Sequence, residues 1–210
     1  GRSILGPAAG VSGFGAGDLR GFVGERYGPR QMVLCAAGAV DHDAICAQAE
    51  TLFGHLRPIP ASGALEPARF EGGERREDRD LEQVHFALAL EGPNYRDPEI
   101  YAAQVWANAM GGGMSSRLFQ EIRERRGLCY TIFAQAGAYE DTGLTTIYAG
   151  TSAGEIEQLA GVVMDEMKRA AGDMSGAEVE RAKVQMKAGM LMGLESPSHR
   201  AERLARMLSI

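Results

Sequence analysis

The spacing of hydrophobic positions predicts that helices and strands occupy separate stretches of this chain. Apolar residues recur every three or four positions in seven stretches, which begin near residues 18, 42, 98, 116, 154, 175 and 197. Shorter apolar or alternating runs, typical of strands, cover residues 31–37, 69–78, 82–90, 128–138 and 143–150. The last four runs form two consecutive pairs, and each pair is predicted to be an antiparallel hairpin.

Segregation of hairpins and helices decides the fold class. The pattern predicts an α+β fold in which an antiparallel sheet is packed on one face by helices. The alternation is strictest at Val84, Phe86, Leu88 and Leu90, which predicts a half-buried strand. Residues 1–17 are rich in Gly, Ala and Pro and have no period, so they are expected to be the remnant of an interdomain linker, with the domain itself spanning residues 18–210.

Several polar residues stand where helices are predicted to begin. Asp18, Asp41 and Asp97 each precede an apolar-periodic stretch and are expected to cap it, the last with Pro98 at the first helical position. Ser175 and Glu178 have the spacing of a capping box. These caps fix the predicted starts of the helices.

Composition narrows the class of protein. The chain has 210 residues, a net charge of -6 and 45% hydrophobic residues, which is ordinary for a globular protein with a substantial core. No apolar run reaches the roughly 18 residues of a membrane-spanning helix, and basic residues are interspersed with acidic ones, so neither a membrane span nor a nucleic-acid partner is expected. Three separated cysteines favour a reducing compartment, with the cytoplasm as the default.

Candidate metal ligands are scattered along the chain. The histidines stand at His42, His55, His85 and His199. None lies three or four residues from another, so the paired histidines of a helix-borne zinc site are absent. His42 lies between two aspartates at a predicted helix start, which favours a cap over a ligand set, and His85 is expected on the solvent side of its strand. Cys129 has no histidine nearby in sequence and is expected to be buried. The sequence predicts no metal site in this chain.

The run Gly111-Gly112-Gly113 lies between two predicted helices and has three interpretations. The preceding helix favours a helix end followed by a tight reversal. Nucleotide binding is disfavoured, because no strand leads into the run and no phosphate-loop lysine follows it. Binding of an extended peptide by the bare backbone is the third interpretation, and it needs evidence from outside the run.

The residues after this run form a long motif that identifies a family. Residues 112–130 have the sequence GGMSSRLFQEIRERRGLCY. This motif resembles the hallmark of the second half of the pitrilysin and insulinase family of zinc metallopeptidases, and it is most similar to the short bacterial members and to the mitochondrial processing peptidase. Shorter matches occur in order along nearly the whole chain, among them Asp18-Leu19, Gly72-Gly73 and Leu194-Glu195-Ser196. A motif of this length is far more specific than a short pattern.

The resemblance implies that this chain is the carboxy-terminal, metal-free half of a two-half protein. In the family the zinc ligands, an inverted His-x-x-Glu-His motif with a further glutamate, lie in the first half, so zinc is expected in the parent protein and in a domain absent from this chain. The family's large members place an arginine and a tyrosine, seven residues apart in their second pair of domains, beside the zinc-bound substrate carbonyl, and Arg123 and Tyr130 match that spacing. In the partner subunit of the processing peptidase, the glycine-rich loop before the motif is associated with substrate recognition. Here that loop is reduced to Gly111, Gly112 and Gly113, which are therefore candidate substrate-binding residues.

Without the family, Arg123 would be interpreted as a solvated helix residue and Tyr130 as a strand residue at the sheet surface. With it, the expected function is that of the second domain of a zinc metalloendopeptidase that cleaves peptides or unfolded chains in a closed chamber. The chain is expected to supply a chamber wall and the Arg123–Tyr130 pair, and to be inactive alone. Its expected partners are the peptide substrate, the missing amino-terminal zinc domain and a homo- or heterodimer partner.

Two further expectations follow from the family. A half of this kind continues beyond a position like Ile210, so the domain is expected to lack its last elements. The alternative function is that of a structural or partner subunit of the same family whose first half has lost its zinc ligands. The presence or absence of the zinc motif upstream of Gly1 distinguishes the two functions.

Overall fold

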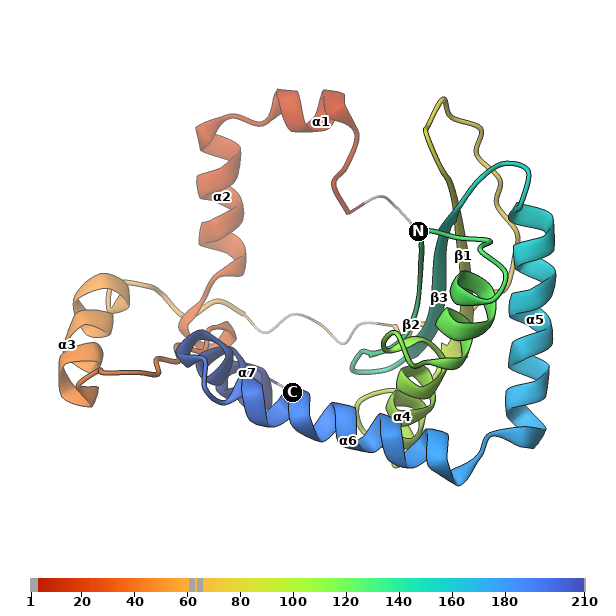
Figure 1. The fold of residues 1–210 in the computed structure, drawn as a ribbon. Helices are drawn as coiled ribbons and strands as arrows, with labels where there is room; N and C mark the ends of the chain where they lie inside the picture. Colours follow the sequence, from red (N-terminus) through yellow and green to blue (C-terminus); the bar gives the residue numbers. More distant parts are fainter. Residues whose placement is uncertain (1–3, 61–62, 64–65, 210) are drawn as a thin grey trace. The chain divides into compact units, whose positions relative to one another are not determined.

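The computed structural model describes most of the chain, namely residues 4–60, 63 and 66–209. It has two compact units: unit 1, which comprises residues 1–65 and 194–210, and unit 2, which comprises residues 66–193. Figure 1 follows the elements of both units along the chain. The predicted domain limits, 18–210, remain a prediction.

Unit 2 is built on a three-stranded antiparallel sheet in the order β1-β3-β2. The strands are β1 (Val84–Gly92), β2 (Thr131–Ala138) and β3 (Gly143–Thr151). β2 and β3 form the predicted second hairpin, in which Ala134 lies opposite Ile147. β1 pairs with the other side of β3 and places Leu88 opposite the same Ile147. The middle of β3 is therefore the centre of the sheet.

The prediction of the first hairpin is wrong, because residues 69–78 form no strand. This stretch is mostly charged and, apart from the half-buried Phe70, exposed, and its side chains make local ion pairs such as Arg76–Glu74. A strand is stabilised by burying one of its faces, and this stretch has no apolar face to bury. β1 instead finds its partner in β3, far along the chain.

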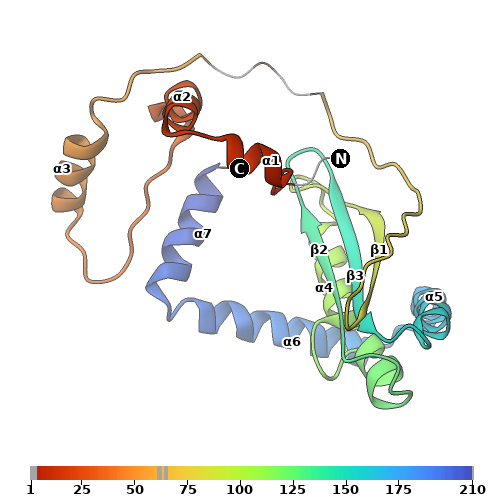
Figure 2. The same ribbon diagram turned by 90° about the horizontal axis from the view of Figure 1, so that it is seen from above.

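Helices cover one face of the sheet in unit 2. They are α4 (Ile100–Gly111), the π-helical turn η2 (Phe119–Glu124), α5 (Ile156–Asp173) and α6 (Gly176–Gly193). Figures 1 and 2 show α4 and α5 beside the same sheet, and α6 packs against α4. The predicted α+β fold, a sheet packed on one face by helices, is confirmed. No helix in the described part of the chain has both the length and the apolar character to cross a bilayer.

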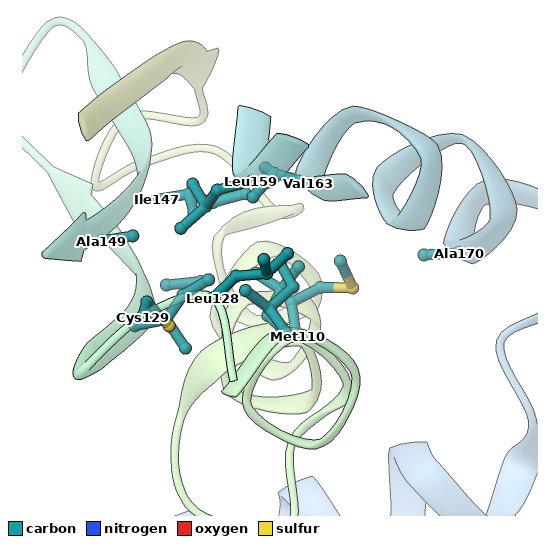
Figure 3. Packing of buried hydrophobic residues seen from close by; sticks show 12 residues of the cluster. Met110, Leu128, Cys129, Ile147, Ala149, Leu159, Val163 and Ala170 are labelled. Atoms are coloured by element: carbon teal, nitrogen blue, oxygen red, sulfur yellow. The ribbon is translucent and has the colours of Figure 1, made fainter. Parts of the chain in front are cut away.

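The core of unit 2 lies between the sheet and these helices (Figure 3). The largest fully buried hydrophobic side chains are Met110, Leu118, Ile122, Ile147, Leu159 and Val163. Leu159 and Val163 belong to the predicted apolar stripe of α5, so the helical period of the sequence directs α5 onto the sheet. Each such side chain contributes about 2 kcal/mol when it is fully buried.

The opposite face of the sheet carries a small aromatic group. Phe133 of β2 stacks on Tyr148 of β3 with ring centroids 5.1 Å apart. His85 of β1 is exposed, as predicted, and its Nδ1 lies 2.7 Å from the hydroxyl oxygen of Tyr148. These side chains link all three strands on the face that α4 and α5 leave uncovered.

Two of the predicted helix starts are confirmed by their caps. Asp41 accepts a hydrogen bond from the Ala44 N–H at 2.8 Å and begins α3 (His42–Phe53). The capping box begins α6: the Glu178 N–H donates to Ser175 Oγ at 3.3 Å, and the Glu178 carboxylate accepts from the Ser175 N–H at 2.9 Å.

Two other starts differ from the prediction. α2 (Ala16–Arg26) begins before Asp18, which lies inside its first turn and accepts from the Gly15 N–H at 2.8 Å. Asp97 accepts from the Glu99 N–H at 2.8 Å, but this bond closes a turn that precedes α4. In both cases the carboxylate satisfies a free backbone donor as a cap does, shifted by two or three positions.

Unit 1 contains helices and connecting segments. They are α1 (Ala8–Gly13), α2, the 3₁₀ turn η1 (Pro29–Gln31), α3 and α7 (Pro197–Ser209). α1 lies within residues 1–17, for which the sequence predicted no element. The predicted strand at 31–37 is not formed. A strand needs the backbone of a neighbour to satisfy its polar groups, and the described part of unit 1 offers no strand to pair with it.

Candidate functional site

The glycine run at the head of the motif is a helix end followed by a reversal, as the favoured interpretation predicted. α4 ends at Gly111 and Gly112 is its cap residue. The next turn closes at once, because both the N–H and the Oγ of Ser116 donate to the Gly113 carbonyl oxygen. The run thereby joins α4 to the following turn.

Gly111 lies where α4 passes close to the sheet. A Cβ built on Gly111 would lie 2.8 Å from the Ala134 Cβ and nearer still to the backbone of β2. A Cβ on Gly113 would meet only the end of the Gln185 side chain, at 3.8 Å. Gly111 is therefore required by packing, while Gly113 is not. Substrate binding by Gly111, Gly112 and Gly113 stays a prediction.

Two buried anchors hold η2 against the core. Leu118 and Ile122 are four residues apart and both are fully buried. The Arg125 N–H donates to the Gln120 carbonyl oxygen at 3.0 Å. This hydrogen bond spans five residues, as in a π-helix. Arg123, next to the anchored Ile122, is exposed. The segment that carries Arg123 is thus held from below by core packing.

A glycine reversal connects η2 to the sheet. Gly127 has a φ of 65°, which is the left-handed conformation that glycine adopts without strain. The Leu128 N–H donates to the Ile122 carbonyl at 3.0 Å and closes the turn. Two residues after Leu128, the Tyr130 N–H donates to the Gly150 carbonyl of β3 at 3.0 Å. Tyr130 therefore stands at the entry of β2, at the end of the reversal that begins beside Arg123.

Arg123 and Tyr130 present exposed polar groups. The Arg123 guanidinium lies over the Phe119 ring, 4.6 Å from its centroid, and has no acidic partner in the described part of the chain. Tyr130 is 67% exposed. Among the described residues no hydrogen bond joins the two side chains. They emerge on either side of one turn, and both are accessible to a third group.

The other three arginines of the motif are engaged. Arg125 and Arg126 both pair with Glu121, at 2.8 and 2.9 Å. Arg117 pairs with Glu178 of α6 through two hydrogen bonds of 2.8 Å and also contacts Asp173 of α5. Arg123 therefore differs from the other arginines of the motif: its guanidinium lies over an aromatic ring, while theirs contact carboxylates.

The sequence alone favours Arg117, like Arg125 and Arg126, as a surface or substrate-path charge, and the structure corrects this for Arg117. Its side chain is 13% exposed and that of Glu178 is 20% exposed. The pair lies in a surface pocket of about 480 Å³ between η2, α5 and α6, where further arginines and carboxylates neutralise one another. The capping box identifies Glu178 as part of the start of α6. A sequence pattern within α6 cannot show that Glu178 also binds Arg117, which lies far away in the sequence. Arg117 ties the segment that carries Arg123 to α5 and α6.

Glu178 couples the stability of unit 2 to pH. Hydrogen bonding from Arg117, assisted by Ser175 and opposed by burial, lowers the pKa of the Glu178 carboxyl from 4.5 to about 2. A carboxyl whose pKa falls on folding stabilises the fold above its unfolded pKa, and this stabilisation is lost as the pH falls through the folded pKa. We expect Glu178 to account for a loss of about 3 kcal/mol in unfolding free energy between about pH 5 and pH 2.

Urea unfolding at several pH values, followed by the fluorescence of Trp106, measures this loss, because Trp106 is the chain's one tryptophan and packs against the core of unit 2. Glu178→Gln should flatten the decline in acid. Glu180→Gln, on the same helix, is the matched control: the Glu180 carboxylate pairs with Lys183 at the exposed surface, where solvent screens the pair, so this substitution should change the decline far less. Equal declines in Glu178→Gln and the unmodified chain would contradict the assignment.

Potential metal ligands are scattered over the described part of the chain. The described residues contain no group of three or more His, Cys, Asp or Glu side chains that could hold a metal ion. One pair escaped the sequence analysis: His42 and Cys46 lie one turn apart on α3, with Nε2 and Sγ 3.5 Å from each other. The four-residue spacing between His42 and Cys46 was the available signal, but the prediction concerned pairs of histidines. Two side chains without a third do not fit a resident zinc.

Cys129 has the environment of a core residue. It is buried as predicted, and burial raises the pKa of its thiol. Because the thiolate is the reactive form, this environment disfavours a nucleophile at this position.

The fold and the motif define an α+β domain that exposes Arg123 and Tyr130 at one helix-to-strand reversal. The chain belongs to the peptidase M16 inactive domain family, whose model matches residues 14–186. This confirms the resemblance to the carboxy-terminal half of the zinc metallopeptidase family.

Curated relatives are named as zinc proteases. An uncharacterized zinc protease from Rickettsia bellii is 36% identical over 211 residues, which cover 100% of this chain and 51% of the relative. One from Bacillus subtilis is 32% identical over 97% of this chain and 50% of its own length. The chain spans about half the length of the curated relatives it matches. The zinc of this family is therefore expected in the other half.

Solved structures confirm the fold. A protease from Helicobacter pylori matches with a TM-score of 0.81 at 20% identity, over 98% of this chain and 52% of its own. A chain of complex III from Candida albicans matches with a TM-score of 0.83 at 22% identity, over 99% of this chain and 52% of its own. At these identities the likeness concerns the fold alone.

Proposed function

We propose that this chain is the non-metal half of a zinc metalloendopeptidase that cleaves peptides or unfolded chains in a closed chamber. In this proposal the chain supplies one wall of the chamber and two hydrogen-bond donors, Arg123 and Tyr130. The zinc belongs to the other half of the protein, where it would activate the attacking water. The chain by itself is expected to be inactive.

One observation carries the proposal: within the motif, Arg123 and Tyr130 are exposed while the other arginines are committed to carboxylates. Arg125, by contrast, pairs with Glu121. Arg123 is instead supported by the Phe119 ring, which holds the guanidinium without occupying its N–H donors. Both groups are therefore free to bind a substrate.

The chemistry of peptide cleavage needs donors of this kind. As the carbonyl carbon is attacked, negative charge develops on its oxygen, and donors placed in advance stabilise it. A phenol O–H and a guanidinium both donate, and neither must first be released from another partner. Their supports are rigid: core packing fixes η2, and the Tyr130 N–H is bonded to β3. One such donor is worth about 3 kcal/mol in the transition state.

An edge strand supports binding of an extended substrate. β2 lies at the side of the described sheet, and its sequence TIFAQAGA contains neither a proline nor a charge. Natural sheet edges are commonly protected by such residues. An unprotected edge suits the addition of a peptide strand, in which backbone hydrogen bonds give affinity without sequence preference. Tyr130 stands at the beginning of this edge.

The proposal is tested by comparing the full-length protein with residues 1–210. We expect the full-length protein to retain one zinc per chain after dialysis and to cleave an unfolded fluorogenic polypeptide, and residues 1–210 alone to retain substoichiometric zinc and to cleave nothing. Addition of a chelator should abolish the cleavage. A full-length protein that folds but neither binds zinc nor cleaves the polypeptide would identify a structural subunit instead.

A further inference from the structure

The helical segment that carries Arg123 is anchored in the core by apolar side chains. Arg117 and Leu118 are helical and lead directly into η2, so residues 117–124 form one short helical segment. Leu118 and Ile122 are its fully buried anchors. Apolar contacts are not directional. This packing therefore fixes the distance of the segment from the core more closely than it fixes the rotation of the segment.

Arg117 adds a directional contact to this packing. Its Nε and Nη2 donate to the two carboxylate oxygens of Glu178, both at 2.8 Å, and its Nη1 donates to the Asp173 carboxylate. A planar guanidinium that donates two parallel hydrogen bonds to one carboxylate fixes orientation as well as distance. Arg117 thereby joins the start of the segment to the end of α5 and the start of α6.

The ion pairs further along the segment do not have this effect. Arg125 and Arg126 both pair with Glu121, which belongs to η2 itself. A pair within one segment moves with that segment and cannot orient it on its surroundings. Among the motif's arginines, within the described part of the chain, the contact of Arg117 is the one that links the segment to distant elements.

The acceptor of Arg117 is itself held in place. The Glu178 carboxylate accepts from the N–H and the Oγ of Ser175, at 2.9 and 2.8 Å. One turn later on α6, Ala182 is buried, and α6 packs against α4. Hydrogen bonding from Arg117 is the main cause that lowers the pKa of the Glu178 carboxyl to about 2, so the carboxylate is charged at neutral pH. The contact therefore has a fixed and charged base.

The rotation of the segment decides where Arg123 points. Its guanidinium lies over the Phe119 ring of the same segment, 4.6 Å from the ring centroid. The arginine and its supporting ring therefore turn together when the segment turns. A displacement of a catalytic group by about 1 Å can lower a rate about 100-fold, so a small rotation is sufficient to impair the donor.

We propose that Arg117 and Glu178 are positioning residues: their pair fixes the rotation of residues 117–124 and so holds the Arg123 guanidinium where it can donate to the substrate carbonyl. This inference rests on the proposed function for the role of Arg123. Neither residue of the pair touches the substrate. Loss of the pair should therefore lower kcat, and it should do so only while Arg123 is present.

Double-mutant kinetics in the full-length protein test this route. Arg117→Ala should lower kcat about 10-fold and change KM by less than about twofold. In an Arg123→Ala background the same substitution should have no further effect on kcat, because the group that it positions is gone. A general weakening of the fold would lower kcat equally in both backgrounds, and that result would overturn the proposal.

The two members of the pair should act as one unit. Glu178→Gln should lower kcat as Arg117→Ala does, and the combined variant should be no slower than either alone. Arg117→Lys keeps the charge but not the two parallel bonds, so its kcat should lie between those of Arg117→Ala and the unmodified protein. Arg125→Ala, which breaks a pair within the segment, is the matched control and should keep the original kcat. Losses that multiply in the combined variant would contradict the pair.

Hydrogen exchange tests the structural part of the proposal without any activity. In the full-length protein Arg117→Ala should speed the exchange of amides 119–128 at least about 10-fold. Ile147→Val weakens the centre of the sheet without touching the pair and should leave these amides unchanged.

The two measurements separate the possible failures. If Arg117→Ala leaves the exchange of amides 119–128 unchanged, or if Ile147→Val speeds it equally, the proposal is overturned whether or not the protein cleaves peptides. If these amides respond as expected but Arg123→Ala does not lower kcat, the pair still positions the segment, and it is the proposed role of Arg123 that is wrong.

Discussion

Tyr130→Phe in the full-length protein is expected to lower kcat about 100-fold with a much smaller change in KM. The substitution removes one hydroxyl and leaves the ring in place. The hydroxyl of Tyr130 has no hydrogen-bond partner among the described residues, and the side chain is 67% exposed, so its loss should not affect folding. If the hydroxyl interacts mainly with the developing oxyanion, its removal destabilises the transition state and barely affects the bound substrate, so kcat falls while KM changes little. Steady-state cleavage of an unfolded polypeptide measures both constants.

Matched variants separate catalysis from surface effects. Tyr139→Phe removes a hydroxyl from another exposed tyrosine, at the turn between β2 and β3, and should leave kcat unchanged. Arg123→Ala should act in the same direction as Tyr130→Phe, whereas Arg125→Ala breaks only a surface pair with Glu121 and should not. Unchanged cleavage by Tyr130→Phe, or a loss that merely follows a lower melting temperature, refutes the role.

Dimers test which chain the donors serve. The short family members are expected to pair, with Arg123 and Tyr130 reaching the zinc half of the partner chain. A chain with a disabled zinc half and an intact Tyr130 should then restore cleavage when it is mixed with Tyr130→Phe. If the donors act within their own chain, the mixture should show no gain over the separate variants.

Much of unit 2 could be predicted because its elements are specified locally. The stripe of α5 and the hairpin of β2 and β3 depend on residues that are close in sequence, so period and turn chemistry are sufficient. The partner of β1 could not be predicted in this way. Residues 69–78 are adjacent to β1 in sequence but mostly charged, whereas β3 is distant in sequence but apolar. β1 pairs with β3 because this pairing buries apolar side chains.

The candidate site was predicted only in part. Arg123 and Tyr130 were found through the family motif, and the absence of a carboxylate partner among the described residues distinguishes Arg123 from the motif's other arginines. The anchoring of Arg117 by Glu178 joins residues far apart in the sequence, and no local pattern contains such a pair. The wrong prediction of a strand at residues 31–37 has the same cause: a strand forms only where a neighbouring strand satisfies its backbone hydrogen bonds, and a local pattern does not show whether that neighbour exists.

The largest effect on stability is expected at Gly111. Gly111→Ala should lower the unfolding free energy of unit 2 by about 3 kcal/mol, because its Cβ would clash with the backbone of β2 as well as with Ala134. Backbone atoms cannot rotate away as a side chain can, so α4 must move off the sheet. Met110, the fully buried neighbour of Gly111, would lose packing in the same movement. Urea unfolding followed by Trp106 fluorescence measures the loss.

Gly113→Ala separates packing from substrate binding in the same run. The nearest side chain to its Cβ would be Gln185 at 3.8 Å, an ordinary contact, so the unfolding free energy should change by less than about 0.5 kcal/mol. If the glycines hold a substrate backbone, this variant should raise KM in the full-length protein while unit 2 remains stable, because a methyl group blocks the approach of another chain. Gly111→Ala as stable as the unmodified chain would show that α4 and β2 are farther apart than described. An unchanged KM in Gly113→Ala would assign the run to packing alone.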